Sequence, residues 1–281
     1  LLFEQAGLDL ALLEVGLGGR LDAVNLVDAD VAVVTTVALD HMEYLGNDRE
    51  AIGAEKAGIF RSRRPAVVGE LDPPDALVRQ GERVGARMIR AGRDYRWAER
   101  LGSTWQWQDA TRKFDLRRPR LIAPAQLANA SAAIAALLAL EDALPISAEH
   151  VAVGVAVAQA TARMQRVPGP VEILIDVAHN PQAAQQLAQW MMRNRCPGAT
   201  QAVFAALSDK DIPNMVGALL GCVDQWRLAG LADAGSRSQD VDQLWRQVAG
   251  LLSRTLSSRH DSVPSALRAA RLQAHPGDRI L

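Results

Sequence analysis

Residues 12–25 read LLEVGLGGRLDAVN: an aliphatic run with one carboxylate, Glu14, then three glycines, then an arginine and an aspartate. The aliphatic run, which starts at Leu8, predicts a buried strand, and the glycines predict a sharp turn after it. Ligands of open α/β sheets bind at the carboxyl ends of the strands. Glu14 could hold a hard cation such as Mg²⁺ there, or it could simply reach solvent. The glycines do not form a dinucleotide-binding GxGxxG motif, because residue 21 is Leu.

Outward from this stretch, strand-length apolar runs alternate with helix-length segments, which predicts α/β architecture. In the first half we expect strands at 30–39 and 64–70, helices at 48–60, 72–86, 125–140 and 148–160, and a polar hairpin with exposed aromatic side chains at 103–119. In the second half we expect strands at 171–177, 200–207, 223–231 and 277–281, and helices at 181–192, 212–221, 238–252 and 262–273. Pro168, Gly169 and Pro170 break the pattern, so we place a domain boundary near residue 168.

The composition excludes several classes of protein. The net charge of −1 gives no electrostatic reason to expect a nucleic acid or an anionic membrane as partner. No apolar run reaches the roughly 18 residues of a membrane span. Cys196 and Cys222 are too few for a disulfide framework, which indicates a reducing cytosol. The arginine-rich stretches at 61–64 and 117–120 are expected to be solvated loops.

Two residues of the first half are candidates for chemistry beside Glu14. His41 directly follows the strand expected at 30–39, so Glu14 and His41 could share one metal ion if their strands are neighbours. Lys56 lies on the next helix and is one of only three lysines among 31 basic residues. A lysine can act as a neutral amine, which an arginine cannot. The alternative is an ordinary surface lysine paired with Glu50 or Glu55.

In the second half, residues 175–181 read IDVAHNP. Asp176 ends an expected strand, Asn180 is a good helix N-cap, and Pro181 suits the first helical position. The free N–H groups of such a helix start bind anions, and His179 would project into the same crevice. An ordinary capped turn explains Asn180 and Pro181 but accounts less easily for Asp176 and His179.

The motifs LEVGLGGRLDAVN, ALDHMEYLG, EKAGIF, IDVAHNP and SDKDI, in this order, resemble the folylpolyglutamate synthase/dihydrofolate synthase family within the Mur ligase superfamily. The resemblance implies a Mur-ligase-like central α/β domain with a parallel-rich sheet at 1–167, followed by a smaller Rossmann-like α/β domain at 168–281. It also implies a cytoplasmic, monomeric ligase. Such an enzyme uses ATP to join L-glutamate to dihydropteroate, or to the γ-carboxylate of a folate, through an acyl phosphate.

The resemblance also implies roles for individual residues. It makes Glu14 and His41 the ligands of Mg²⁺, and it makes Lys56 a carbamylated lysine that helps to hold the metal and a nucleotide phosphate. It assigns the pterin-binding segment to Leu21, Asp22 and Ala23. It assigns ATP contacts around the domain interface to Asn129, Arg163 and Asp176, with His179 beside them.

One feature of the family is missing. The family carries an ATP-binding glycine loop of the GxxGKGS kind, and this chain has no Gly-Lys dipeptide. The loop is expected before Leu1, so we interpret the sequence as a fragment and expect the 281-residue chain alone to bind ATP poorly and to have no ligase activity. Two alternatives stay open: another Mur-type amino-acid ligase of peptidoglycan synthesis, and a non-catalytic nucleotide-binding protein.

Overall fold

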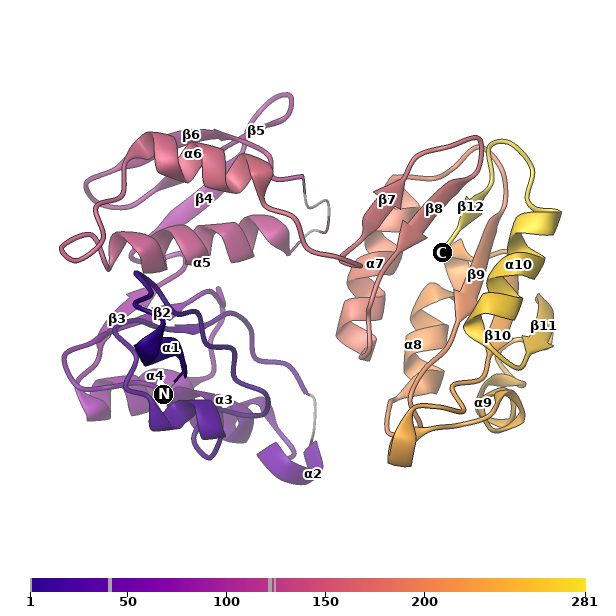
Figure 1. The fold of residues 1–281 in the computed structure, drawn as a ribbon, viewed down its shortest axis with the longest axis horizontal. Helices are drawn as coiled ribbons and strands as arrows, with labels where there is room; N and C mark the ends of the chain where they lie inside the picture. The colour runs from indigo at the N-terminus through magenta and orange to yellow at the C-terminus, as the bar shows by residue number, and fades with distance from the viewer. Residues whose placement is uncertain (1, 40–41, 121–122, 124) are drawn as a thin grey trace. The chain divides into compact units, whose positions relative to one another are not determined.

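The computed structural model describes residues 2–39, 42–120, 123 and 125–281. The chain forms two compact α/β units, drawn in Figure 1, which confirms the predicted fold class. The first unit comprises the residues up to Pro119 together with Leu127–Val157, and the second comprises Arg120–Gln126 and Ala158–Leu281. The chain therefore enters the second unit for good at Ala158, before the domain boundary expected near residue 168. The reason is that β7 (Gln165–Val167) pairs with β8 (Glu172–Ile175) and so belongs to the second sheet.

A parallel sheet of three strands organises the first half of the first unit. Its order is β1-β2-β3, with β1 at Ala32–Val34, β2 at Pro65–Val68 and β3 at Arg87–Arg90. Two longer helices, α3 (Arg49–Ala57) and α4 (Asp75–Val84), pack against each other, and two short ones are α1 (Leu2–Gln5) and α2 (Met42–Leu45). The core between sheet and helices includes Ile52, Phe60, Val68 and Leu77.

Local signals place α3 and α4 where the sequence predicts them. The Asp48 side chain accepts a hydrogen bond from the backbone N–H of Ala51 at 2.7 Å, so it caps α3 as expected. Helix α4 ends at Gly85, whose φ of 74° is the left-handed conformation that glycine adopts without strain. The start of α3 and the end of α4 are therefore set by residues of their own sequence, whereas the first N–H groups of α4 donate to Glu50 on α3.

The strand predicted at residues 8–16 is wrong. These residues form no strand, and Leu8, Leu10 and Leu12 are 51%, 51% and 94% exposed. A strand needs a hydrogen-bonded neighbour. β1 pairs with β2 on one side, and no strand of the described residues pairs with its other edge. The aliphatic composition of this stretch therefore does not produce a strand here.

A second, antiparallel sheet packs with two helices in the same unit. Its order is β4-β5-β6, with β4 at Arg96–Glu99, β5 at Thr104–Gln108 and β6 at Lys113–Arg117. The helices are α5 (Gln126–Leu138) and α6 (Ala148–Val157). The predicted hairpin is present, but its aromatic side chains are not exposed: Trp105 and Trp107 are 0% and 1% accessible. Trp107 donates its indole N–H to the carbonyl of Ser131 on α5, because the hairpin packs on that helix.

The second unit is built on one sheet of six strands in the order β11-β10-β9-β12-β8-β7. All its neighbouring strands are parallel except the β7–β8 pair. The remaining strands are β9 (Thr200–Phe204), β10 (Gln225–Ala229), β11 (Leu256–His260) and β12 (Arg279–Ile280). The helices are α7 (Pro181–Arg193), α8 (Ile212–Leu219), α9 (Val241–Val248) and α10 (Val263–Gln273), with α10 packed on β9, β10 and β11 (Figure 1).

The predicted helices and strands of this unit are confirmed, whereas β7 and β11 were not expected from the sequence. The core of the unit includes Leu174, Met191, Trp226 and Leu228. Within the residues that the structure describes, no helix combines the length and the apolar character that crossing a bilayer requires.

Candidate functional site

The glycine-rich turn at residues 16–20 is folded around the carboxylate of Asp22. This side chain accepts hydrogen bonds from the backbone N–H groups of Gly16 at 3.0 Å, Leu17 at 2.9 Å and Val24 at 2.9 Å. Asp22 is also the N-cap of the short 3-10 helix η1 (Ala23–Leu26). The hydrogen bonds from Leu17 and Val24 hold the pKa of Asp22 below its ordinary value. The carboxylate therefore shapes its own loop.

The same turn lies directly against the carboxyl end of α3. The backbone N–H of Arg20 donates to the carbonyl of Glu55 at 2.9 Å, and the Arg20 guanidinium pairs with the Glu55 carboxylate at 2.9 Å. A Cβ on Gly19 would lie 3.0 Å from the Glu55 carbonyl oxygen and 3.1 Å from that of Lys56, so a side chain here would push the turn away from the helix end. The turn thus comes next to the helix end that carries Lys56.

Asn25 and Arg61 join the two segments. Asn25 Nδ2 donates to the carbonyls of Arg20 and Gly58, at 3.0 and 3.1 Å. Arg61 Nη2 donates to the backbone carbonyl and to Oδ1 of Asn25, at 2.8 and 2.9 Å, and its Nε pairs with Asp28. The expectation of a solvated loop at 61–64 is wrong for Arg61, whose side chain is only 25% exposed because it is bonded to residues far away in sequence.

The predicted metal ligands are described only in part. Glu14 lies in the irregular, exposed stretch before the turn, and its carboxylate makes no hydrogen bond or ion pair with any residue that the structure describes. An exposed carboxylate that its neighbours leave available fits the role of an oxygen ligand for Mg²⁺. His41 lies outside the described residues, and among the residues that the structure does describe no three His, Cys, Asp or Glu side chains are grouped closely enough to hold a metal.

In the second unit, Asp176 fastens the loop that carries Arg163. Its carboxylate accepts hydrogen bonds from the backbone N–H of Met164 at 2.8 Å and of Ala178 at 2.7 Å. Ala162 and Met164 have φ angles of 56° and 48°, an uncommon conformation. The hydrogen bond from Met164 supports it, as does the one from the Val177 N–H to the carbonyl of Ala162 at 2.9 Å. The Arg163 side chain is exposed. The structure therefore brings the loop that carries Arg163 next to Asp176, at the carboxyl end of β8.

Helix α7 begins immediately after this loop. Asn180 accepts a hydrogen bond from the N–H of Ala183 at 2.9 Å and Pro181 occupies the first turn, so the predicted cap is confirmed. His179 is exposed, and its Nδ1 lies 3.1 Å from the carbonyl oxygen of Val177. Asn129, the third predicted nucleotide contact, lies half-buried on α5 in the first unit.

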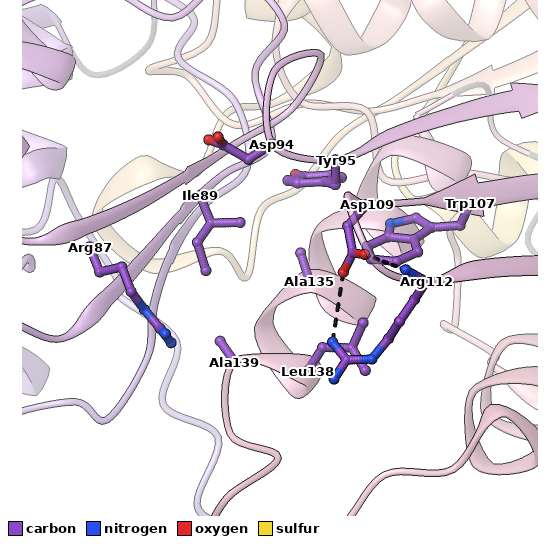
Figure 2. Close-up of a pocket in the computed structure, with 10 residues that line it drawn as sticks. All are labelled: Arg87, Ile89, Asp94, Tyr95, Trp107, Asp109, Arg112, Ala135, Leu138 and Ala139. Atoms are coloured by element: carbon purple, nitrogen blue, oxygen red, sulfur yellow. Dashed lines mark hydrogen bonds and ion pairs between the residues drawn. The ribbon is translucent and has the colours of Figure 1, made fainter.

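A cavity of about 210 Å³ lies elsewhere in the first unit, between β3, β5 and α5 (Figure 2). Its walls include Tyr95 and Trp107, whose rings stack with centroids 6.1 Å apart. Arg87 and Arg112 lie on opposite sides of it, and Arg112 pairs with Asp109 at 3.7 Å. The lining contains no predicted site residue, so this cavity is separate from the glycine turn.

Two family models match nearly the whole chain. The Mur ligase middle domain matches residues 1–137, and the Mur ligase glutamate ligase domain matches residues 162–281. The dihydrofolate synthase/folylpolyglutamate synthase of Escherichia coli strain K12 is 41% identical over all 281 residues. The chain spans 63% of that protein, and 65% of the Haemophilus influenzae protein of the same name.

Solved structures agree with these matches. The structure of E. coli FolC in complex with DHPP and ADP has a TM-score of 0.90 and 40% identity, covering 100% of this chain and 64% of that one. A bifunctional folylpolyglutamate synthase/dihydrofolate synthase with Mn, AMPPNP and L-glutamate bound has a TM-score of 0.87 and 39% identity, covering 99% and 64%. The chain belongs to the folylpolyglutamate synthase/dihydrofolate synthase family of Mur ligases.

Proposed function

We propose that the protein is an ATP-dependent ligase that joins L-glutamate to dihydropteroate, to the γ-carboxylate of a folate, or to both. The observation that carries the proposal is the 41% identity, over the whole chain, to a dihydrofolate synthase/folylpolyglutamate synthase. The geometry of the first unit supports it. The segment proposed to contact the pterin, residues 21–23, follows a turn that is fastened to the helix end bearing Lys56.

The reaction has two steps. An oxygen of the substrate carboxylate attacks the γ-phosphorus of ATP, the bond to the β-phosphate oxygen breaks, and ADP leaves from an acyl phosphate. The amine of L-glutamate then attacks the acyl carbon, loses a proton, and expels phosphate from the tetrahedral intermediate to give the amide. Phosphoryl transfer of this kind depends mainly on positioning and on neutralising negative charge.

The first unit supplies residues for both requirements. Glu14 and His41 are the proposed ligands of Mg²⁺, which when bound neutralises charge on the phosphate oxygens. Lys56, carbamylated at Nζ, would carry a negative charge and so help to hold the metal rather than repel it. Leu21, Asp22 and Ala23 present the pterin surface, and the Asp22 carboxylate acts by holding the shape of that segment.

Other residues are proposed to hold the nucleotide. Arg163 offers an exposed guanidinium for phosphate oxygens, and Asp176 fixes the loop on which it lies. Asn129 offers an amide, and His179 lies just before the start of α7, where backbone N–H groups favour an anion. The E. coli relative solved with ADP supports nucleotide binding by this family.

The test is a matched pair of lysine variants in the complete protein as the cell makes it. Lys56→Arg keeps a cation but cannot be carbamylated, so we expect amide formation to fall at least 100-fold and the mass increment of a carbamate to disappear. Lys113→Arg, on the exposed edge of β6, is the control and should leave both unchanged. Normal turnover in Lys56→Arg would refute the assigned role.

Substrate choice is tested by glutamate-dependent ADP release with dihydropteroate, with a reduced folate and with UDP-muramyl substrates. We expect release with the first two alone, and release with only the UDP-muramyl substrates would refute the proposal.

We also propose a cytoplasmic monomer: Cys196 and Cys222 are free thiols, as a reducing compartment favours. Light scattering on purified protein tests the monomer.

A further inference from the structure

Asn25 lies between the two segments proposed to work together, and its side chain bonds both. Its Nδ2 donates to the carbonyl of Arg20, the residue immediately before the segment 21–23, at 3.0 Å. The same Nδ2 donates to the carbonyl of Gly58, two residues after Lys56, at 3.1 Å. One amide nitrogen therefore ties the pterin segment to the helix end that carries Lys56.

Arg61 holds this amide in its working orientation. Its Nη2 donates to Oδ1 of Asn25 at 2.9 Å, so the oxygen of the amide faces a donor while the nitrogen faces two acceptors. Its Nη1 donates to the carbonyl of Gly58 at 3.2 Å, the same oxygen that Asn25 reaches. A cation beside the last carbonyls of a helix is favourable, because those groups carry the negative end of the helix dipole.

The turn and the end of α3 are packed closely around Asn25 and Arg61. A Cβ on Gly58 would lie 2.4 Å from Cβ of Arg20, so the turn and the helix end are in direct contact where Asn25 bridges them. Arg61 presents several N–H groups in a fixed plane, whereas a lysine would present one charged point. The orientation of the amide consequently depends on the guanidinium shape as well as on its charge.

We propose that Asn25 and Arg61 form a latch that positions the pterin segment relative to Lys56, so that the substrate carboxylate and the phosphoryl group meet in the reactive alignment. This proposal rests on the proposed ligase function. Both residues act through the backbone of the pterin segment and of the helix end, so both are positioning residues. A shift of about 1 Å in such an alignment can reduce a rate about 100-fold.

Three variants of the complete protein separate positioning from general stability. Asn25→Asp keeps the partner of Arg61 but replaces the donating nitrogen by an oxygen that faces two carbonyls. Arg61→Lys keeps the positive charge but loses the planar set of N–H donors of the guanidinium. Arg64→Lys is the matched control, since Arg64 lies three residues further on and makes an exposed ion pair with Asp30 at 2.8 Å.

The measurements are steady-state kinetics and the melting temperature. We expect Asn25→Asp and Arg61→Lys to lower kcat/KM for the pteroate or folate substrate at least tenfold. We expect KM for L-glutamate to stay within twofold, because the latch is proposed to position the pterin segment and not the binding site of L-glutamate. Hydrogen exchange at residues 16–25 should accelerate in both variants. Arg64→Lys should match the wild type throughout.

Two other results would have distinct meanings. If the wild type forms the amide and both latch variants retain its kcat/KM, or lose activity only in proportion to the fraction that is unfolded, the latch is refuted. A wild-type protein that forms no amide from dihydropteroate or folate would refute the proposed function itself.

Discussion

Gly58 and Gly154 offer a direct test of how tightly the glycine turn is packed on α3. Both have backbone conformations that alanine can adopt, and Gly58 has a φ of −61°. At Gly154, inside α6, an added Cβ meets nothing within 4 Å. At Gly58 it would lie 2.4 Å from Cβ and 2.6 Å from Cα of Arg20. The same substitution therefore fills open space at one site and collides with backbone at the other.

The expected free energies have opposite sign. Gly154→Ala should stabilise the protein by about 0.5–1 kcal/mol, the usual preference for alanine over glycine inside a helix. Gly58→Ala must move Arg20 by about 1 Å to restore normal carbon–carbon contact. Such overpacking costs about 1–3 kcal/mol, so a net loss of about 1–2 kcal/mol remains after the gain from the lost glycine.

The assay is thermal or urea unfolding of the 281-residue chain, combined with hydrogen exchange of peptides covering residues 16–25. A difference of about 2 kcal/mol between the two variants corresponds to roughly 4–8 °C in melting temperature for a unit of about 150 residues or more. Exchange in 16–25 should accelerate only in Gly58→Ala. If Gly58→Ala is as stable as Gly154→Ala, the close contact between turn and helix is refuted.

Three further predictions concern single side chains. Burial and the charge of Arg227 lower the pKa of His260 below its ordinary value, so the unfolded chain binds the proton more tightly. Stability should be highest above about pH 6.5 and fall as the pH drops through the depressed pKa, and urea titrations of His260→Gln should lose this dependence. Burial raises the pKa of Cys222 to about 11, so alkylation at pH 8 should be slow in the folded protein and fast in urea. Asp22→Asn should accelerate hydrogen exchange in residues 16–24, because it weakens acceptance from three backbone N–H groups; unchanged exchange would contradict this account of the loop.

The parts of the fold that the sequence predicts well depend on neighbours in the chain. Asp48 and Asn180 were expected to cap helices, and each accepts a hydrogen bond from a backbone N–H three residues later. The same locality explains why the alternation of helices and strands in the second unit could be predicted. Capping and periodicity are properties of a few consecutive residues.

The predictions that were wrong concern features that depend on contacts with residues far away in the sequence. Residues 8–16 have the composition of a strand, but a strand forms only beside a partner. Trp107 was expected to be exposed, and it is buried because α5, whose Ser131 carbonyl accepts its N–H, covers the hairpin. Arg61 was placed in a solvated loop, and its partner Asn25 lies 36 residues away in sequence. A single sequence does not reveal pairings over such separations.

The predicted site residues also differ in how far the sequence alone could place them. Arg163 and Asp176 come together because strand β8 and the loop before β7 meet at one sheet edge. Asp22 was assigned to the pterin-binding segment, which stays a prediction, and its carboxylate bonds three N–H groups of its own loop. Its spacing from the glycines was visible in the sequence, but the direction of its side chain was not. The roles of Glu14, His41 and Lys56 stay predictions.

The glycine turn keeps its shape through backbone amides, the Asp22 carboxylate and the polar contacts of Arg20 and Asn25, and not through its leucine side chains. Leu17 and Leu21 are 38% and 79% exposed, so both can be exchanged without disturbing the frame beneath them. A rigid scaffold with replaceable surface residues is a favourable starting point for altered substrate preference. Randomising these two positions, while Gly19 and Asp22 are kept, would explore new acceptor molecules at little risk to folding.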